Sequence, residues 1–317
     1  MKKTILGAVI VFIMITAIFS YNFYLFNIKR YTFIKQEIEI VYGTGLNNII
    51  NRLGIKNNRL IKVYINYKKY GHNIKAGYYE LNGKYTFNEI IKILIIGKSK
   101  TIKITIPEGY TIKQIVAKLE SEELIKKEIF YEKLQKKKDF YFFVENSNYE
   151  GFFYPDTYFF HKNEGEEKII DKFLNRFLDE FPAKQYKDKV DFYNKLILAS
   201  IIEKEAYYDN EREIISSVFQ NRIKKNMRLE SCATVEFLYD YKKTRLTYND
   251  LKIDSEYNTY KIYGLPPAPI CNPGKKSIIA AFYPKNTEFL YFVAKSNREH
   301  IFSKTYEEHL YNQKRIK

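Results

Sequence analysis

The chain has 317 residues, of which 45% are hydrophobic and 28% charged, so it can bury one large or two modest cores and is neither disordered nor fibrous. Its formal net charge is +16, carried mostly by Lys along the whole chain. This favours an anionic or membrane-facing environment over a dedicated phosphate-binding protein, although an AT-rich genome produces the same bias. Two cysteines, Cys232 and Cys271, form at most one bridge and lack the paired spacing of a zinc site.

The segment from Thr4 to Phe26 contains no charged residue. At roughly 1.5 Å per residue, about 23 helical residues cover the roughly 30 Å hydrocarbon core of a bilayer. We therefore predict a transmembrane anchor within residues 1–28. A cleaved signal peptide is the alternative, but this run exceeds the roughly 7–15 apolar residues of such a peptide. Basic residues flank the segment on both sides, so charge alone leaves its orientation open.

Residues 37–100 predict a small α+β module. Four short patterns follow one another, namely a strand at 37–42, a helix at 46–55, a strand at 78–83 and a helix at 86–97. Gly43 and Gly45 mark a turn after the first strand, and Thr86 has the position of a helix cap.

The second predicted domain, residues 101–317, begins with a strand pattern at 101–106 and a turn at Pro107. Thr111 and Gln114 have the spacing of a capping box, which predicts a helix from residue 112. Helical and strand patterns alternate irregularly after this point, so the expected fold class is α+β.

The aromatic segment at 149–160 does not follow a helical pattern. Pro155 stops a helix near Tyr154, and Asp156 can cap or turn the chain that follows. We interpret the segment as a shaped loop or groove edge, with an aromatic core segment as the alternative.

Residues 191–225 read as two helical runs joined near Asp209 and Asn210. At about 100° per residue, Glu205 falls in the middle of the apolar stripe of the first run, whereas Glu203 falls on the opposite side and is predicted to lie on the surface. A carboxyl group on a buried stripe loses hydration, which raises its pKa and suits it to general acid catalysis. The alternative is a structural ion pair between Glu205 and a nearby Lys or Arg.

The segment at 257–274 contains four prolines and two glycines, which predicts a rigid irregular loop that presents Tyr257, Asn258 and Tyr260. Aromatic faces and amide groups suit carbohydrate, whereas a plain connection between elements is the alternative. A short helix at 275–283, a strand at 288–295 and a Thr-capped terminal helix are expected after it.

An ordered series of segments across about two thirds of the chain resembles the endolytic murein transglycosylases of the YceG-like family, which cut bacterial peptidoglycan. The segments are IPEGYTIKQI at 106–115, EGFFYPDTY at 150–158, ASIIEKEA at 199–206, SVFQNRIKKNMRLES at 217–231, TV at 234–235, YNTYKIYGLPPAPICNPG at 257–274 and YFVAKSNREHIFSKTYEEH at 291–309. The resemblance implies an N-terminal anchor, a LysM-like module at 37–100 and a YceG-like catalytic domain at 101–317.

The family's catalytic glutamate is the second one of its E-K-E signature, which corresponds to Glu205. This agrees with the helical pattern. Two departures are present: Ala206 stands where the family usually has a hydroxyl residue, and Cys232-Ala233 replaces its Asp-Pro. Neither removes the acid, so the expectation is activity with an altered rate or preference.

The mechanism implied by the resemblance is non-hydrolytic cleavage of the MurNAc-β-1,4-GlcNAc bond, with Glu205 as both acid and base and 1,6-anhydro-MurNAc ends as product. Our candidates for substrate contacts are Asn258, Tyr257, Tyr260, Ser231, Thr234 and Asp156. The resemblance further implies a single-pass protein of the cell membrane, with a cytoplasmic N-terminus and an extracytoplasmic body. Its expected partners are peptidoglycan glycan strands and peptidoglycan synthases.

A catalytically silent peptidoglycan-binding scaffold is the alternative function, which loss of the acid would favour, but Glu205 is present. A nucleic-acid binder is disfavoured because the charge is dispersed and no aromatic-basic motif occurs. The four histidines are scattered, and the motifs of metal, nucleotide and serine-hydrolase chemistry are missing from the sequence, so we expect no metal and no cofactor.

Overall fold

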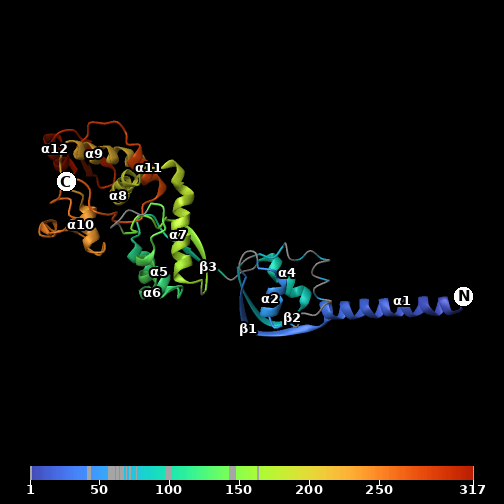
Figure 1. The fold of residues 1–317 in the computed structure, drawn as a ribbon. Helices are drawn as coiled ribbons and strands as arrows, with labels where there is room; N and C mark the ends of the chain where they lie inside the picture. Colours follow the sequence, from blue (N-terminus) through green and yellow to red (C-terminus); the bar gives the residue numbers. More distant parts are fainter. Residues whose placement is uncertain are drawn as a thin grey trace. The chain divides into compact units, whose positions relative to one another are not determined.

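The computed structural model describes residues 2–40, 44–55, 61, 64, 68, 70, 73–75, 77–97, 101–142, 148–162, 164–243 and 245–316. The chain forms two compact units (Figure 1), and each is described by itself. The first unit contains Met1–Ile102 and Phe159–Lys162, and the second contains Lys103–Tyr158 and Asn163–Lys317. The turn predicted at Gly43 lies outside the described residues.

The first unit begins with helix α1 (Lys2–Phe23), which continues as a π-helical turn, η1 (Tyr24–Ile28). By length and composition, the stretch Val9–Ile28 is apolar enough to cross a membrane, a test that a signal sequence also passes. Large apolar side chains of α1 are exposed, with Phe19 at 73%. An apolar helix without a polar face needs an apolar environment, so this finding supports a membrane-associated segment.

Strand β1 (Arg30–Ile40) pairs antiparallel with β2 (Gly77–Thr86), and helices α2 (Leu46–Arg52) and α4 (Phe87–Ile96) belong to the same unit. The strand begins earlier than the predicted start at residue 37. The Thr86 hydroxyl accepts from the Glu89 N–H and the Glu89 side chain accepts from the Thr86 N–H, which confirms the predicted cap of α4. The core of this unit is mainly aliphatic and includes Leu25 and Phe26 of η1.

The second unit is a mixed α+β domain. Its helices are α5 (Ile112–Ser121), α6 (Lys127–Lys136), α7 (Glu166–Glu180), α8 (Lys189–Glu205), α9 (Arg212–Lys224), α10 (Cys232–Leu238), α11 (Lys275–Phe282) and α12 (Tyr306–Ile316), with short 3-10 turns at Ala183–Gln185, Asp209–Glu211 and Asp250–Lys252. Strand β5 (Tyr291–Ala294) pairs antiparallel with β6 (His300–Ser303) in this unit. Strands β3 (Thr101–Thr105) and β4 (Thr157–His161) pair with each other, and each has residues in both units. The capping box of Thr111 and Gln114 is present at the start of α5, as predicted.

Helix α8 occupies the centre of the second unit, where α9, α10 and α11 contact it. Its side chains are buried around most of its circumference, including Ser200. A helix surrounded in this way has no single apolar stripe, so its sequence pattern does not show which side faces solvent. The C-terminal end of α8 is consequently held in place from several directions.

The aromatic segment at 149–160 belongs largely to the core. Phe152 packs edge-on against Phe177 with ring centroids 5.2 Å apart, and Phe153 stacks on Phe173 at 4.8 Å. The alternative interpretation of this segment, an aromatic core, is therefore the one the structure shows.

The loop at 257–274 is irregular, as predicted, but it buries Ile270, Cys271 and Asn272. Both cysteines are free thiols.

Candidate active site

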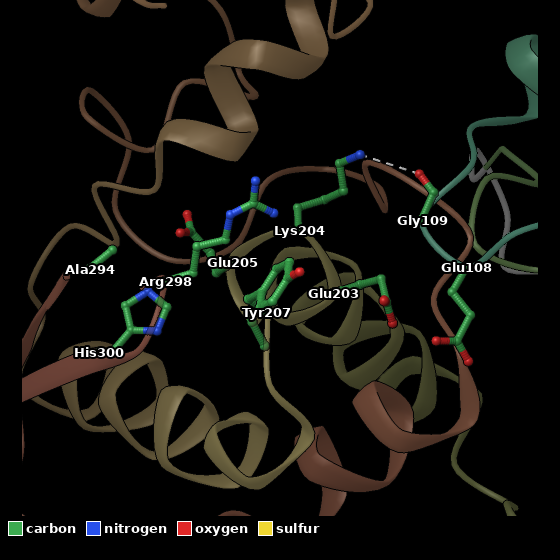
Figure 2. Close-up of a pocket in the computed structure, with 10 residues that line it drawn as sticks. Glu108, Gly109, Glu203, Lys204, Glu205, Tyr207, Ala294, Arg298 and His300 are labelled. Atoms are coloured by element: carbon green, nitrogen blue, oxygen red, sulfur yellow. Dashed lines mark hydrogen bonds between the residues drawn. The ribbon is translucent and has the colours of Figure 1, made fainter. Parts of the chain in front are cut away.

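Glu205 is the last residue of α8 and lies between two cavities. The first cavity has a volume of about 450 Å³ and is shown in Figure 2. The second has a volume of about 350 Å³, and Glu205 lines both. These volumes fall in the roughly 300–1,000 Å³ range of ligand sites. An extended ligand that occupies both cavities would therefore run past the Glu205 carboxyl group.

The Glu205 carboxyl group is held by Ser231, whose hydroxyl donates to Oε1 at 2.5 Å. Ser231 is itself fixed by two buried threonines. The Ser231 N–H donates to Thr259 Oγ1 at 3.0 Å, and Thr234 Oγ1 donates to the Ser231 carbonyl at 2.8 Å. The hydroxyls of Thr234 and Thr259 are also bonded to each other, at 2.9 Å. This hydroxyl network sets the direction of the carboxyl group.

Burial raises the pKa of Glu205 above its ordinary value. The hydrogen bond from Ser231, the charge of His300 and the Ala233 N–H act in the opposite direction, and Glu236 adds a further rise. Burial is the largest of these effects. Glu205 therefore keeps its proton to a higher pH than an exposed glutamate does, which is the direction that general acid catalysis needs.

Glu203 is not a surface residue, contrary to the prediction from the helical pattern. Its side chain is 7% exposed, and its Oε2 lies 3.4 Å from Arg212 Nη1. The same oxygen accepts from the Gly274 N–H at 3.0 Å and from the Ser277 hydroxyl at 2.7 Å. Because α11 covers this side of α8, the residue that forms the structural ion pair is Glu203 rather than Glu205.

A buried Glu–His pair lies beside Glu205. His300 Nδ1 is 2.8 Å from Glu211 Oε2, and the His300 N–H donates to Glu211 Oε1 at 2.8 Å. The carboxylate of Glu211 therefore fixes both the ring and the backbone of His300, whose side chain lines the first cavity. Because His300 is the first residue of β6, this pair holds the start of that strand close to the C-terminal end of α8.

Arg222 of α9 organises the wall of the second cavity. Its guanidinium donates to the carbonyls of Leu290, Arg228 and Leu229, and pairs with Glu230 at 3.0 Å. The residues that line this cavity are Glu205, Arg222, Leu229, Glu230, Cys232, Tyr260, Phe292, His309 and Gln313. The Cys232 thiol lies 3.0 Å from the Tyr260 hydroxyl, so the residue that departs from the family pattern forms part of the cavity wall.

Only some of the predicted substrate-binding residues lie at the cavities. Ser231 contacts Glu205, and Tyr260 lines the second cavity. The other four candidates line neither of the two cavities. Asn258 is 0% exposed, donates to the carbonyls of Leu251 and Ile253, and accepts from the Tyr260 N–H.

The remaining three candidates have other contacts. Thr234 belongs to the hydroxyl network, and Tyr257 packs against Phe237 with ring centroids 5.0 Å apart. Asp156 accepts from Arg176 Nε at 2.6 Å. Asn258 and Thr234 thus position the residues that face the cavities.

Sequence reasoning did not identify Lys204, Arg298, His300 and Arg222 as cavity residues. All four lie within the segments that resemble the family, which was the available signal. Helical or strand periodicity could not reveal them, because their neighbours come from distant parts of the chain. Among the described residues, no group of three or more His, Cys, Asp or Glu side chains could hold a metal ion.

Comparisons with known proteins identify the family. The YceG-like family model matches residues 38–315. The endolytic murein transglycosylase of Bacillus subtilis is 35% identical over an alignment of 305 residues, covering 86% of this chain and 82% of that protein. The endolytic murein transglycosylase of Streptococcus pneumoniae is 28% identical, and its match covers 84% of this chain and 55% of that longer protein.

A solved structure is also similar. The crystal structure of a yceG-like protein from Listeria monocytogenes superposes with a TM-score of 0.61 at 34% identity, covering 88% of this chain and 99% of that one. The family model spans most of the chain, including the helix that ends in Glu205 and both cavities beside it. This chain therefore belongs to the YceG-like family.

Proposed function

We propose that this protein is a peptidoglycan lytic transglycosylase that cleaves the MurNAc-β-1,4-GlcNAc bond and leaves 1,6-anhydro-MurNAc ends. The observation that carries the proposal is the carboxyl group of Glu205, which lies between two cavities and whose pKa is raised by burial. The names of the relatives, endolytic murein transglycosylases, support the same reaction class.

In the proposed reaction, Glu205 first donates its proton to the glycosidic oxygen, and the GlcNAc unit leaves with that proton. The resulting Glu205 carboxylate accepts the hydrogen bond of Ser231 and then takes the proton of the C6 hydroxyl. The C6 oxygen bonds to C1 and closes the anhydro ring, and Glu205 regains its proton. No water is consumed, and one residue serves as acid and as base.

Hydrolysis needs a second carboxylate about 5–9.5 Å away, and two glutamates near Glu205 are already paired with arginines. Glu203 is bound to Arg212, and Glu230 is paired with Arg222. Glu236 is close enough to raise the pKa of Glu205, so it is the residue to test as a second carboxylate.

The first unit is proposed to tether the enzyme to its substrate. In this proposal α1 is a single-pass anchor of the cell membrane, with a cytoplasmic N-terminus and the second unit outside. The module at 37–100 would be LysM-like and bind glycan. The expected partners are glycan strands and peptidoglycan synthases, because nascent strands emerge at the outer face of the cell membrane.

The test is mass spectrometry of peptidoglycan strands digested by the full chain in detergent micelles. We expect anhydro ends with the native protein and none with Glu205→Gln, which keeps the shape of the side chain but cannot donate a proton from a carboxyl group. Glu236→Gln is the matched control and should still produce anhydro ends. A native product with reducing ends would refute the transglycosylase mechanism.

The alternative of a silent scaffold makes a different prediction for the same samples. It predicts strand binding by native and Glu205→Gln proteins alike, with no new ends from either. Binding without cleavage by the full chain would therefore replace the proposed function with the scaffold.

A further inference from the structure

The first cavity contains two cationic side chains without an acidic partner. Lys204 and Arg298 both line it, next to Glu205 and His300. Among the residues that the structure describes, no carboxylate lies within 4.0 Å of either cationic group. An unpaired charge beside a concave site is available to a ligand of opposite charge.

Each of these cations rests on an aromatic ring. Lys204 Nζ lies 3.7 Å from the centroid of the Tyr241 ring. It also donates to the Gly109 carbonyl at 3.4 Å, a bond that Figure 2 marks with a dashed line. The Arg298 guanidinium lies 4.6 Å from the centroid of the Tyr207 ring. Cation–π contacts orient a charge without neutralising it. Both groups are therefore pre-positioned and keep their full charge.

The backbone of Arg298 supports a role for its side chain. Arg298 lies in the turn between β5 and β6 with φ of 69°, a left-handed conformation that glycine adopts without strain. The turn is fixed by the Arg298 N–H, which donates to the Lys295 carbonyl at 2.9 Å, and by the Tyr208 hydroxyl, which donates to the Asn297 carbonyl at 3.2 Å. A strained residue that faces a cavity is a candidate for function.

Besides Glu205, two acidic residues line this cavity, and neither cancels these cations. Glu203 is neutralised by Arg212. Burial raises the pKa of Glu108, and the nearby charge of Glu203 adds to the rise. In Figure 2 the Glu108 and Glu203 carboxyl groups lie on the side of the cavity away from Arg298. The part of the cavity beside Glu205 is therefore suited to an anion.

We infer that Arg298 and Lys204 form a subsite for a carboxylate carried by the substituent on the MurNAc ring. This inference rests on the proposed function, because only a strand bound across Glu205 places that substituent in the cavity. The carboxylate has two possible sources: the peptide stem, or the lactyl group once the peptide has been removed. Planar guanidinium groups bind carboxylates through two parallel hydrogen bonds, which suits Arg298 to this role.

The experiment compares strands before and after their carboxylates are capped as neutral methylamides. Two strand types are used, one with peptide stems and one stripped of them by an amidase, and the full chain in detergent micelles is assayed for kcat/KM. We expect capping to lower kcat/KM about tenfold, mainly through KM, as for loss of a charge-assisted hydrogen bond. A loss with stem-bearing strands alone identifies the stem carboxylate, and a loss with stripped strands identifies the lactyl carboxylate.

Variants of Arg298 assign the effect to the subsite. Arg298→Gln should lower kcat/KM on uncapped strands about tenfold and be insensitive to capping, whereas Arg298→Lys should retain part of the difference. Arg298→Gly should lose the same activity without a lower melting temperature, because glycine relieves the left-handed strain. The matched control is Arg315→Gln, since Arg315 also lies over a tyrosine, Tyr311, but lines neither cavity.

Two results would overturn the subsite: no effect of capping on the native protein, or a capping effect that Arg298→Gln leaves intact. Failure of the proposed function is separable from both. If the native protein cleaves no strand, strand binding still measures the subsite. Capped and uncapped strands are then bound to the Glu205→Gln variant and to the double variant Glu205→Gln, Arg298→Gln. On uncapped strands we expect an affinity difference of about tenfold between the two proteins.

Discussion

Ser231 is the direct support of the Glu205 carboxyl group, and Ser231→Ala isolates that support. The hydrogen bond at 2.5 Å lowers the pKa of Glu205 and stabilises the carboxylate formed when the proton leaves. A hydrogen bond to a charged group contributes about 1.5–3 kcal/mol, so we expect kcat to fall about tenfold or more. Its loss should also move the alkaline limb of the pH profile to higher pH, because the acid then keeps its proton longer.

A pH–rate profile of the purified full chain checks this prediction. Ser121→Ala is the control, since the Ser121 hydroxyl bonds only its own helix in α5. An unchanged alkaline limb in Ser231→Ala, or a shift to lower pH, would show that Ser231 does not act on the Glu205 proton.

The two glutamates of the E-K-E signature should respond oppositely to replacement by glutamine. Glu203→Gln leaves Arg212 without its buried partner, and breaking a buried ion pair costs about 3 kcal/mol or more, although Asp209 still contacts that arginine. Glu205→Gln removes a carboxyl group whose ionisation is penalised by burial, so stability near neutral pH should be unchanged or higher. Thermal unfolding of both variants at pH 7 provides the measurement. Equal destabilisation by both would contradict the separate roles.

At the scale of elements, one amide and one carboxyl group join three loops next to the first cavity. Glu150 accepts from the Ile112 N–H at 3.0 Å and from Asn272 Nδ2 at 2.8 Å. Asn272 Oδ1 accepts from the N–H groups of Gly151 and Phe153, and the Asn272 carbonyl accepts from the Gly109 N–H. These bonds fix the loop that contains Glu108 and Gly109 against the aromatic core.

The Glu150 carboxyl group should make the fold sensitive to pH. Burial raises its pKa to about 8, while its hydrogen bonds act in the opposite direction. A raised folded-state pKa means that stability is greatest below about pH 4.5 and declines as pH rises towards about 8. The melting temperature of the native protein should therefore fall between pH 5 and pH 8, and Glu150→Gln should reduce that slope. An identical slope in the variant would assign the pH dependence to Glu205 and Glu108, whose pKa values are also raised.

Local sequence signals predicted much of this architecture. The caps at Thr86 and Thr111, the paired helices α8 and α9 and the irregular proline-rich loop depend on neighbours within a few residues, and all are confirmed. The environment of Glu203 was predicted wrongly, because a helical wheel assumes one solvent-facing side and α8 is enclosed by three other helices. The pairing of His300 with Glu211 joins residues far apart in sequence, which periodicity cannot detect.

At the scale of the whole molecule, the turn that ends the N-terminal helix is built into the core of the first unit. Leu25 and Phe26 of η1 are buried, and Phe26 stacks on Tyr64 with ring centroids 3.8 Å apart. Asn88 Nδ2 donates to Asn27 Oδ1 at 2.9 Å. The helix thus continues into the folded part of the unit without a flexible linker, so the end of this apolar helix is also a structural element of the first unit.

Two truncations separate these roles. A chain that lacks residues 2–20 keeps Leu25 and Phe26 and should retain the stability of the first unit, whereas a chain that lacks residues 2–26 loses both. Removing a buried Phe side chain costs about 3–5 kcal/mol, so the longer truncation, and Phe26→Ala in the full chain, should weaken the unit by at least that amount. Amide hydrogen exchange of β1 and β2 measures this locally, without interference from the second unit.

Phe19→Ala is the matched control, because Phe19 is exposed on α1 and its loss should leave exchange of β1 and β2 unchanged. Equal protection in the two truncated chains would show that η1 belongs to the anchor alone. The expected difference instead means that activity lost on the longer truncation, beyond any lost on the shorter one, reports unfolding of the first unit rather than loss of the apolar helix.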